Sequence, residues 1–213
     1  VRAVTDAQVM AVVKADGYGH GAIPVARAAL AAGATWLGVA QVEEAVPLAA
    51  ATGARVFSWI YTPEMDLVPA IAAGIDLAAG STEAVAQVAA AAQRAGTAAR
   101  VHLALDTGMA REGVRPEGWE ELVCAALAAP TVRVVGMWSH LACADESSSG
   151  ATEAQQRRFE EAAVAAARLG ATFEVRHLAN SAGTLWHPAT HYDLVRVGIA
   201  LYGLAPDGSD PAA

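Results

Sequence analysis

The sequence is almost without lysine. Lys14 is the single lysine in 213 residues, and the other 13 of the 14 basic residues are arginine. Arginine can replace a lysine that only carries charge, but it cannot replace an amine that must lose a proton or form an imine. Lys14 is therefore either a nucleophile or a chance survivor whose stem packs while its ammonium group stays in water. This residue alone does not separate the two interpretations.

Cysteine is scarce as well, because Cys124 and Cys143 are the only two. They lack metal-ligand spacing and are too few for a disulfide framework, so we expect no metal site and a reducing, cytoplasmic location. No signal peptide is recognisable, and no apolar run reaches the roughly 18 residues of a membrane helix. We therefore expect a soluble protein without a membrane partner.

Basic clusters are also missing. The net charge is −8 and the isoelectric point is about 5.2, so we expect no nucleic-acid partner. The length fits one large domain, and an α/β barrel of this size is a single domain. The opening VRAVTDAQ looks like the middle of a domain and PDGSDPAA like the start of a linker. These ends suggest a fragment of a longer protein.

Short β-prone runs alternate with alanine-rich helical runs along the whole chain. Such alternation implies parallel strands joined by helices, and eight strands in a chain of this length predict an α/β fold of the (β/α)₈ TIM-barrel type. The strands are expected at 10–15, 36–40, 55–60, 76–79, 100–105, 133–139, 174–178 and 194–199. The helices are expected near 23–32, 42–51, 63–73, 82–95, 116–128, 152–169 and 181–186.

The alternative fold is an open, doubly wound sheet. No G-x-G-x-x-G follows the first strand in dinucleotide spacing, which disfavours that alternative. Instead, Lys14 stands where a short apolar run meets three glycines, in MAVVKADGYGHG.

Polar residues follow several of the predicted strands. A barrel carries its chemistry at the C-terminal ends of its strands, so these residues are expected on one rim. Each has a structural alternative: His140 as a satisfied strand-end histidine, Arg111 as a surface ion pair, and Asn180 as a helix cap. Together they predict a functional site, formed by Lys14, Arg111, His140, Asn180, Ser181 and Arg196.

The same rim offers a seat for phosphate. The amides of Gly198 and Ile199, the hydroxyl of Ser181 and the helix start after Asn180 all suit an anion. A phosphorylated aldehyde held by a lysine is pyridoxal phosphate, whose ring nitrogen needs a protein partner such as Asp or Arg.

Arg196 is the natural candidate for that partner. An arginine does not give up its proton, so the ring nitrogen should stay neutral, which favours returning a proton to the α-carbon over transamination. His140 is expected to bond Arg196 from behind and fix it.

Five collinear motifs resemble the alanine racemase family. AVVKADGYGHG resembles its cofactor-lysine motif and HLALDTGMAREGV its strand-five arginine motif. WSHLACADE, HLANSAGTL and DLVRVGIALYGL resemble its strand-six, strand-seven and strand-eight motifs. The resemblance implies an N-terminal barrel that binds pyridoxal phosphate, followed by an all-β domain, in a homodimer. It also implies that residues 1–205 are this barrel, without most of the first helix, and that 206–213 begin a linker.

The resemblance also implies roles for individual residues. Lys14 matches the lysine that forms the internal aldimine and serves as one acid–base, in a racemase that supplies D-alanine for peptidoglycan. Arg111 matches the arginine near the substrate carboxylate. The remaining matches are cofactor contacts: Tyr18, His140, Asn180, Ser181, Arg196, Gly198 and Ile199.

Two departures from the family pattern matter. The second base of the family is a tyrosine of the C-terminal domain of the partner subunit, and Tyr61, Tyr192 and Tyr202 do not match it. A two-base racemisation needs one acid–base on each face of the α-carbon, so we expect this chain to bind the cofactor but to racemise poorly.

The second departure is Ala104, where many family members carry a carbamylated lysine that holds the strand-five arginine. Our hypothesis is that an exogenous anion holds Arg111 or that Arg111 is mobile, although Asp106 and Glu112 are alternative acceptors.

Two other functions stay open. One is a racemase or decarboxylase for a larger amino acid, such as serine or a basic one, on the same barrel. The other is a barrel that binds the cofactor without catalysis. Visible absorbance that depends on Lys14, followed by a racemisation assay on alanine, would separate these alternatives.

Overall fold

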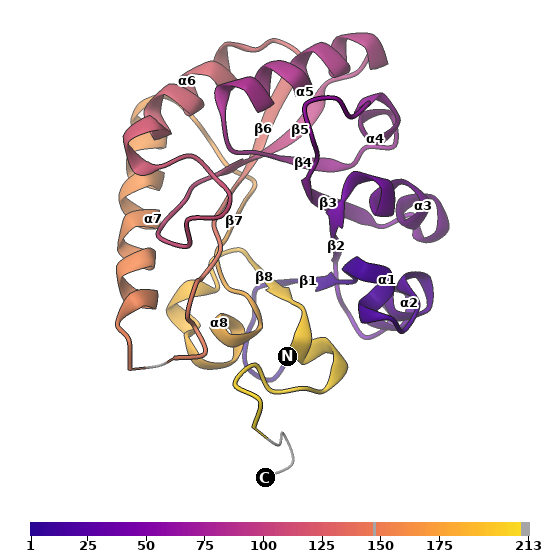
Figure 1. Cartoon of the computed structure of the whole chain (residues 1–213), viewed down its shortest axis with the longest axis vertical. Helices are drawn as coiled ribbons and strands as arrows, with labels where there is room; N and C mark the ends of the chain where they lie inside the picture. The colour runs from indigo at the N-terminus through magenta and orange to yellow at the C-terminus, as the bar shows by residue number, and fades with distance from the viewer. Residues whose placement is uncertain (147, 210–213) are drawn as a thin grey trace.

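The strands lie inside a ring of helices in the computed structural model, which describes residues 1–146 and 148–209. Figure 1 shows this ring. The described residues form eight strands: β1 Gln8–Val12, β2 Trp36–Gln41, β3 Arg55–Ile60, β4 Asp76–Ala79, β5 Ala99–Ala104, β6 Val132–Trp138, β7 Val175–His177 and β8 Leu194–Val197. The predicted barrel is confirmed.

All ladders between neighbouring strands are parallel, in the order β7-β6-β5-β4-β3-β2-β1-β8. Single hydrogen bonds close the remaining seam between β7 and β8. The Asp193 amide donates to the Arg176 carbonyl at 3.1 Å, and the Arg196 amide donates to the Ala179 carbonyl at 3.0 Å. The carboxyl ends of all strands therefore meet at one mouth.

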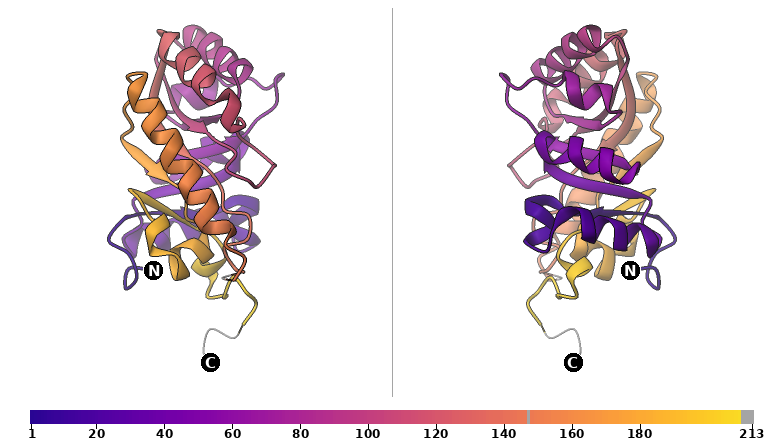
Figure 2. Two further views of the ribbon diagram at one scale, coloured as in Figure 1. Left: turned by 90° about the vertical axis from the view of Figure 1, so that its left-hand side faces the viewer. Right: turned by 90° about the vertical axis from the view of Figure 1, so that its right-hand side faces the viewer.

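The helices cover the outside of the barrel, and Figure 2 shows α7 running along one side of it. Within the described residues they are α1 Lys14–Tyr18, α2 Ala22–Ala31, α3 Val42–Thr52, α4 Val68–Ala72, α5 Thr82–Ala95, α6 Trp119–Ala128, α7 Ala151–Arg168 and α8 Ser181–Trp186. Short 3₁₀ helices are η1 Pro116–Gly118, η2 Pro188–Thr190 and η3 Ile199–Tyr202. No helix among the described residues is long and apolar enough to cross a membrane.

Most predicted boundaries hold to within two residues, and three elements depart further. The helix expected at 116–128 begins at Trp119 as α6, because residues 116–118 form the 3₁₀ helix η1. The helix expected at 63–73 is reduced to α4, because residues 63–66 form turns and Pro69 sits in the first helical turn, where its missing N–H costs nothing. The strand expected at 10–15 ends at Val12, because the chain turns at Lys14.

Aromatic and aliphatic side chains fill part of the barrel interior. Each strand contributes one residue to an apolar cluster, which contains Met10, Trp36, Phe57, Ala78, Ala104, Trp138, Val175 and Leu194. A larger apolar cluster lies between the strands and the helices and includes Trp119, Phe159 and Leu103. The interior also holds polar side chains, among them Asp76, His102 and His177, all fully buried.

Alanine substitution at two glycines of the barrel strands tests how rigid the side chains of this interior are. A Cβ at Gly136 would collide with the imidazole of His102, whereas a Cβ at Gly38 would meet the flexible Met10 thioether, 2.6 Å from its sulfur. His102 is held by hydrogen bonds on both sides, so it cannot yield as Met10 can. We expect Gly136→Ala to lower the free energy of unfolding by about 1–3 kcal/mol, and Gly38→Ala to lower it less. Equal losses in urea titrations would contradict this expectation.

The predicted linker at 206–213 is described only to residue 209, and its last four residues lie outside the described ones. The residues before β1 include a turn at 2–4, and no helix is found in that described stretch. The division into a barrel at 1–205 and a linker stays a prediction.

Candidate active site at the mouth of the barrel

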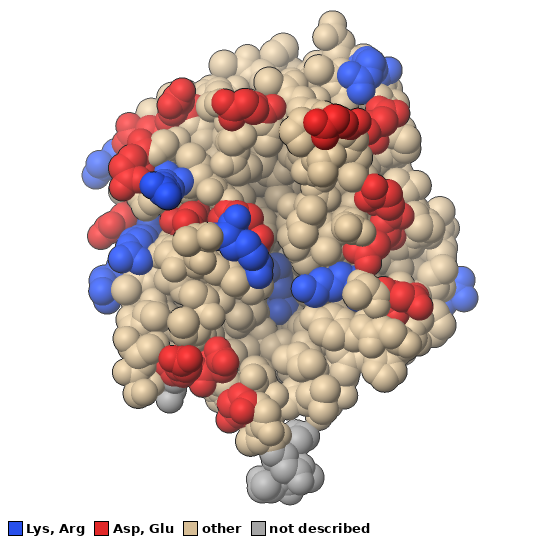
Figure 3. Space-filling model, in the orientation of Figure 1, with Lys and Arg blue, Asp and Glu red and all other residues tan. Residues whose placement is uncertain are grey.

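A pocket of about 280 Å³ opens at the carboxyl ends of the strands. It adjoins a second hollow of about 530 Å³, and the two share Lys14, Trp59, Arg111 and Trp138. Figure 3 shows basic side chains near the hollowed centre of this face, while acidic side chains lie mostly toward its edge. The chain is acidic overall, yet the basic residues that line this pocket, Lys14, Arg111 and Arg196, make it a site for an anion.

The structure brings all predicted site residues to this pocket. Its lining includes each of the nine: Lys14, Tyr18, Arg111, His140, Asn180, Ser181, Arg196, Gly198 and Ile199. They come from loops and strand ends that are up to 185 residues apart in the sequence. The geometry places the residues together, and their individual roles stay predictions.

Lys14 begins a turn with left-handed backbone conformation. Ala15, Asp16 and Gly17 have φ of 52°, 51° and 62°. Such angles cost roughly 1–2 kcal/mol for each residue other than glycine, so neighbouring groups must hold the turn. The Asp16 carboxylate accepts from the Ala22 amide at 2.8 Å, and the Glu44 carboxylate accepts from the Ala15 amide at 2.6 Å. Strain of this kind is typical of functional sites. Here the two hydrogen bonds hold the strained backbone beside the only lysine.

Ser181, Gly198 and Tyr18 form a small polar cradle. The Ser181 hydroxyl accepts from the Gly198 amide at 2.9 Å and from the Ala200 amide at 3.3 Å. A Cβ at Gly198 would lie 2.6 Å from the Tyr18 hydroxyl oxygen and 3.9 Å from the Ser181 hydroxyl oxygen. Glycine therefore leaves the space between the two hydroxyl groups open. Burial raises the pKa of Tyr18, so its hydroxyl stays a neutral donor.

Asn180 has the structural role that was given as its alternative. Its side chain accepts from the Gly183 amide at 3.0 Å and thereby caps α8, while its amide group donates to the Leu141 carbonyl at 3.3 Å. The residue also lines the pocket, so the cap holds the start of α8 beside Ser181.

Arg196 lies at the floor of the pocket and is only 4 % exposed. Its Nη1 and Nη2 atoms donate to carbonyl groups of Ser139, His177 and Leu178 at 2.7–3.1 Å. Burial lowers the pKa of Arg196 to about 9, which still leaves it cationic at neutral pH. Its Nε atom makes no hydrogen bond to any described residue, so this N–H is the donor left for a ligand.

The histidine that holds Arg196 most closely is not the predicted one. His140 lies 3.4 Å from Arg196 Nη2, whereas His177 Nδ1 lies 3.1 Å from Arg196 Nη1 and is fully buried. The prediction named His140 as a support of Arg196 and missed His177, which β7 points inward beside β8. Burial and the Arg196 charge lower the pKa of His140 to about 3 and hold that of His177 well below its usual value. Both rings are therefore neutral.

The hypothesis that an exogenous anion holds Arg111, or that Arg111 is mobile, was wrong. Arg111 binds Glu112 in a bidentate ion pair, with Nε and Nη2 each 2.7 Å from a carboxylate oxygen. These hydrogen bonds raise the pKa of Arg111. Asp106, the other acceptor considered, accepts instead from the amides of Gly108 and Ala110 and shapes the loop.

The tyrosines that do not match the family's second base are occupied elsewhere. The Tyr61 hydroxyl donates to the Ala78 carbonyl, the Tyr192 hydroxyl to Glu160, and the Tyr202 hydroxyl to the Val12 carbonyl. Tyr202 packs against Tyr18, with ring centroids 4.7 Å apart. Among these three, none lines the pocket of about 280 Å³.

Sequence reasoning missed the aromatic wall of the pocket as well as His177. Trp59 is the last residue but one of β3 and Trp138 is the last residue of β6, and both line the two hollows. Their position at strand ends was a usable signal, because residues there face the same rim as Lys14. The indole N–H of Trp138 is buried and has no partner among the described residues.

Comparisons with known proteins give one answer. The family model described as "Alanine racemase, N-terminal domain" matches residues 1–206. The chain is 55 % identical over 210 residues to an alanine racemase of Beutenbergia cavernae and 50 % identical over 204 residues to one of Thermobifida fusca. The two matches include 97 % and 94 % of this chain, but only 56 % and 54 % of the respective relatives. The chain thus spans about half the length of the curated relatives it matches.

Solved structures show the same similarity. The alanine racemase of Streptomyces coelicolor A3(2) superposes with a TM-score of 0.95 at 47 % identity, over 99 % of this chain and 58 % of that one. The alanine racemase of a D-cycloserine producing Streptomyces lavendulae superposes with a TM-score of 0.94 at 47 % identity, over 97 % and 56 %. In both cases the matched part is a barrel domain that accounts for little more than half of the longer chain.

Proposed function

The chain belongs to the alanine racemase family, and from this premise we propose that it is the cofactor-binding barrel of a pyridoxal phosphate-dependent racemase that interconverts L- and D-alanine. The observation that carries the proposal is the convergence of the only lysine with a polar cradle and a buried arginine at one barrel mouth. An unrelated barrel would have no reason to keep this lysine there. We also propose that the whole protein, of which this chain forms the barrel, is a cytoplasmic homodimer.

The pocket fits the cofactor in three respects. The space above Gly198, which a Cβ would fill, lies between two hydroxyl groups and suits a phosphate. The Arg196 Nε–H has no partner among the described residues and suits the ring nitrogen. Trp59 and Trp138 supply apolar walls. Pyridoxal phosphate, when bound, supplies an electron sink that acidifies the α-hydrogen of an amino acid.

Three residues of the chain would then have different roles in the reaction. Lys14 would hold the aldehyde carbon and carry a proton to or from the α-carbon on one face. Arg111, fixed by Glu112, would bind the substrate carboxylate, because a guanidinium group pairs with carboxylates in a fixed geometry. Arg196 would donate to the ring nitrogen and leave it without a proton, which favours reprotonation of the α-carbon.

The opposite face of the substrate lacks a matching group in this chain. We propose that a tyrosine of the partner subunit, from a C-terminal domain of the whole protein, serves there. This chain alone should then bind the cofactor and racemise alanine only slowly.

A titration followed by an assay tests the proposal. Pyridoxal phosphate added to the purified chain should produce visible absorbance, and borohydride reduction should leave its mass on the peptide that contains Lys14. Racemisation of L-alanine, followed by chiral chromatography beside L-serine and L-arginine, should be far slower than in a full-length relative. Failure to bind the cofactor would refute the proposal, and a full-length rate would refute the need for a second subunit.

A further inference from the structure

A column of buried polar side chains runs through the barrel beneath the pocket. Asp76, His102 and His177 are fully buried, and Arg196 is nearly so. They come from β4, β5, β7 and β8. Barrel interiors are usually filled with bulky apolar side chains, and buried ionisable groups are costly unless they are paired. The column therefore needs an explanation that apolar packing does not provide.

The hydrogen bonds of the column all point the same way. Arg196 can only donate, so His177 Nδ1 must accept from it at 3.1 Å. His177 is neutral, so its hydrogen lies on Nε2, which donates to His102 Nδ1 at 2.7 Å. His102 then carries its hydrogen on Nε2 and donates to Asp76 Oδ2 at 3.0 Å. The chain of donors runs from the pocket to a carboxylate.

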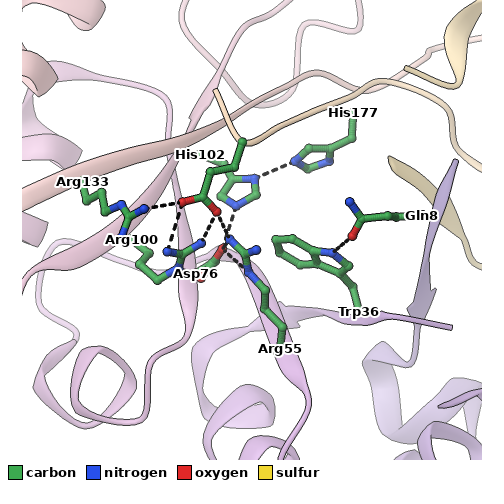
Figure 4. Close-up of polar contacts among 9 residues, drawn as sticks. Gln8, Trp36, Arg55, Asp76, Arg100, His102, Arg133 and His177 are labelled. Carbon is green, nitrogen blue, oxygen red and sulfur yellow. Dashed lines mark hydrogen bonds and ion pairs between the residues drawn. The ribbon is translucent and has the colours of Figure 1, made fainter. Parts of the chain in front are cut away.

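An ionic cluster at the amino ends of the strands fixes that carboxylate. Asp76 accepts from Arg55 at 2.8 Å and from Arg100 at 2.8 Å. Glu174 bridges the same two arginines and also binds Arg133. Figure 4 shows Asp76 between the arginines on one side and His102 on the other. Burial raises the pKa of Asp76, and the His102 hydrogen bond opposes that rise. The guanidinium groups of Arg55 and Arg100, each 2.8 Å from a carboxylate oxygen, favour its charged form.

Arg196 has no carboxylate in direct contact among the described residues. Its bonded partners are carbonyl oxygens and imidazole nitrogens. Glu112 also stabilises the Arg196 charge, but it is bound to Arg111 at the rim. A buried cation with only neutral ligands is unfavourable unless a negative charge polarises those ligands. Asp76 is the first carboxylate reached from Arg196 along the line of side-chain hydrogen bonds through His177 and His102.

We propose that Asp76 and His102 are positioning residues of the site: through His177 they act as the remote counter-charge of Arg196 and hold its Nε–H toward the pocket. The position of the cofactor ring relative to this N–H rests on the function proposed above. The hydrogen-bond chain itself does not, since it joins only residues of this chain.

Histidine NMR on the ligand-free chain tests the hydrogen-bond chain directly. With ¹⁵N-labelled histidine, the spectra should show His177 and His102 both protonated at Nε2 only, each with a low-field N–H proton. A His177→Gln variant assigns the signals. A wild-type spectrum with the hydrogen of His177 on Nδ1 would overturn the proposal, whatever the variants do.

Asp76→Asn separates the charge from the shape of the column. Three N–H contacts favour keeping its oxygen at the Oδ2 position, from Arg55 and His102. The hydrogen bond to His102 therefore survives, while the charge and the Arg100 hydrogen bond to Oδ1 are lost. The His177 Nε2–H proton should move upfield. Glu174→Gln removes the same charge from the same cluster without a bond to a histidine, and it should leave this proton in place. An unmoved proton in Asp76→Asn would overturn the coupling.

A second measurement addresses the positioning role. Pyridoxal phosphate should bind the Asp76→Asn chain several-fold more weakly than the wild type, and bind Glu174→Gln equally well. Equal affinity for Asp76→Asn would overturn the positioning role. If the wild-type chain binds no cofactor, the proposed function fails, while the NMR result still decides whether the column couples Asp76 to Arg196.

Discussion

The Lys14→Ala chain is expected to lose covalent attachment of pyridoxal phosphate completely. Lys14 is the only lysine and lines the pocket, so no other side-chain amine can form the bond to the aldehyde carbon. Visible absorbance after cofactor addition should fall to that of the free cofactor. The dissociation constant should rise at least about 100-fold, or about 2.7 kcal/mol, because only contacts to the phosphate and ring would remain.

Lys14→Arg is the matched control for charge. It keeps a cation in the anion-binding pocket but cannot form an imine, so it should lose the absorbance as fully as Lys14→Ala while retaining more non-covalent affinity. The N-terminal amine of Val1 is the other amine in the chain, and mass spectrometry after borohydride reduction distinguishes the two sites. An adduct of the Lys14→Ala chain in the pocket, without labelling of Val1, would contradict the role of Lys14.

The barrel was predictable because its signal repeats. Each strand is a short apolar run bounded by a glycine or a polar residue, and each helix is rich in alanine, so eight independent segments pointed to one fold. The bounds of β3, β4, α5 and α8 agree with the prediction. The turn at Lys14 did not follow from propensity, because left-handed angles at Ala15 and Asp16 are imposed by contacts with distant groups such as Glu44.

The mouth of the barrel was predictable for a topological reason. Parallel strands bring their carboxyl ends to one side, so residues that follow strands in sequence meet in space. This rule located Lys14, Ser181 and Arg196 at a shared pocket. It could not say which acceptor Arg111 takes, since Glu112 and Asp106 are both close in sequence and only the loop conformation selects between them.

The buried column was not predictable from local patterns. Asp76, His102 and His177 each look like isolated polar residues in apolar strands, and nothing in the spacing between them marks a contact. Their link depends on strand register: β4 pairs Ala78 with His102 of β5, and β6 pairs Trp138 with His177 of β7. Alternation along a strand shows which of its residues face the interior. The offset between neighbouring strands around the barrel decides which of these residues touch.

The stability of the chain is expected to fall steeply in mild acid. His140 and His177 have folded-state pKa values below the ordinary value of about 6.5, to about 3 for His140. The unfolded chain therefore binds more protons, and the contribution of these histidines is present above pH 6.5 and is lost as the pH falls. The loss from His140 alone should be about 1–2 kcal/mol between pH 7 and pH 5, with a limiting slope of about 1.4 kcal/mol per pH unit. His177 steepens the slope in the same direction.

Urea titrations between about pH 7.5 and about pH 5, which bracket the ordinary pKa of histidine, would measure this slope. Substitution of single histidines then assigns it. His140→Asn should remove part of the slope, because the contribution of His177 remains. His20→Asn removes an exposed histidine of the loop that follows Lys14 and controls for the loss of a histidine as such. Carboxylates with ordinary pKa values near 4 stay ionised over most of this range, so they cannot mimic this slope. A free energy of unfolding that is flat across the range would mean that the histidines beside Arg196 take up protons in the folded barrel. The line of neutral histidines between Arg196 and Asp76 would then not exist.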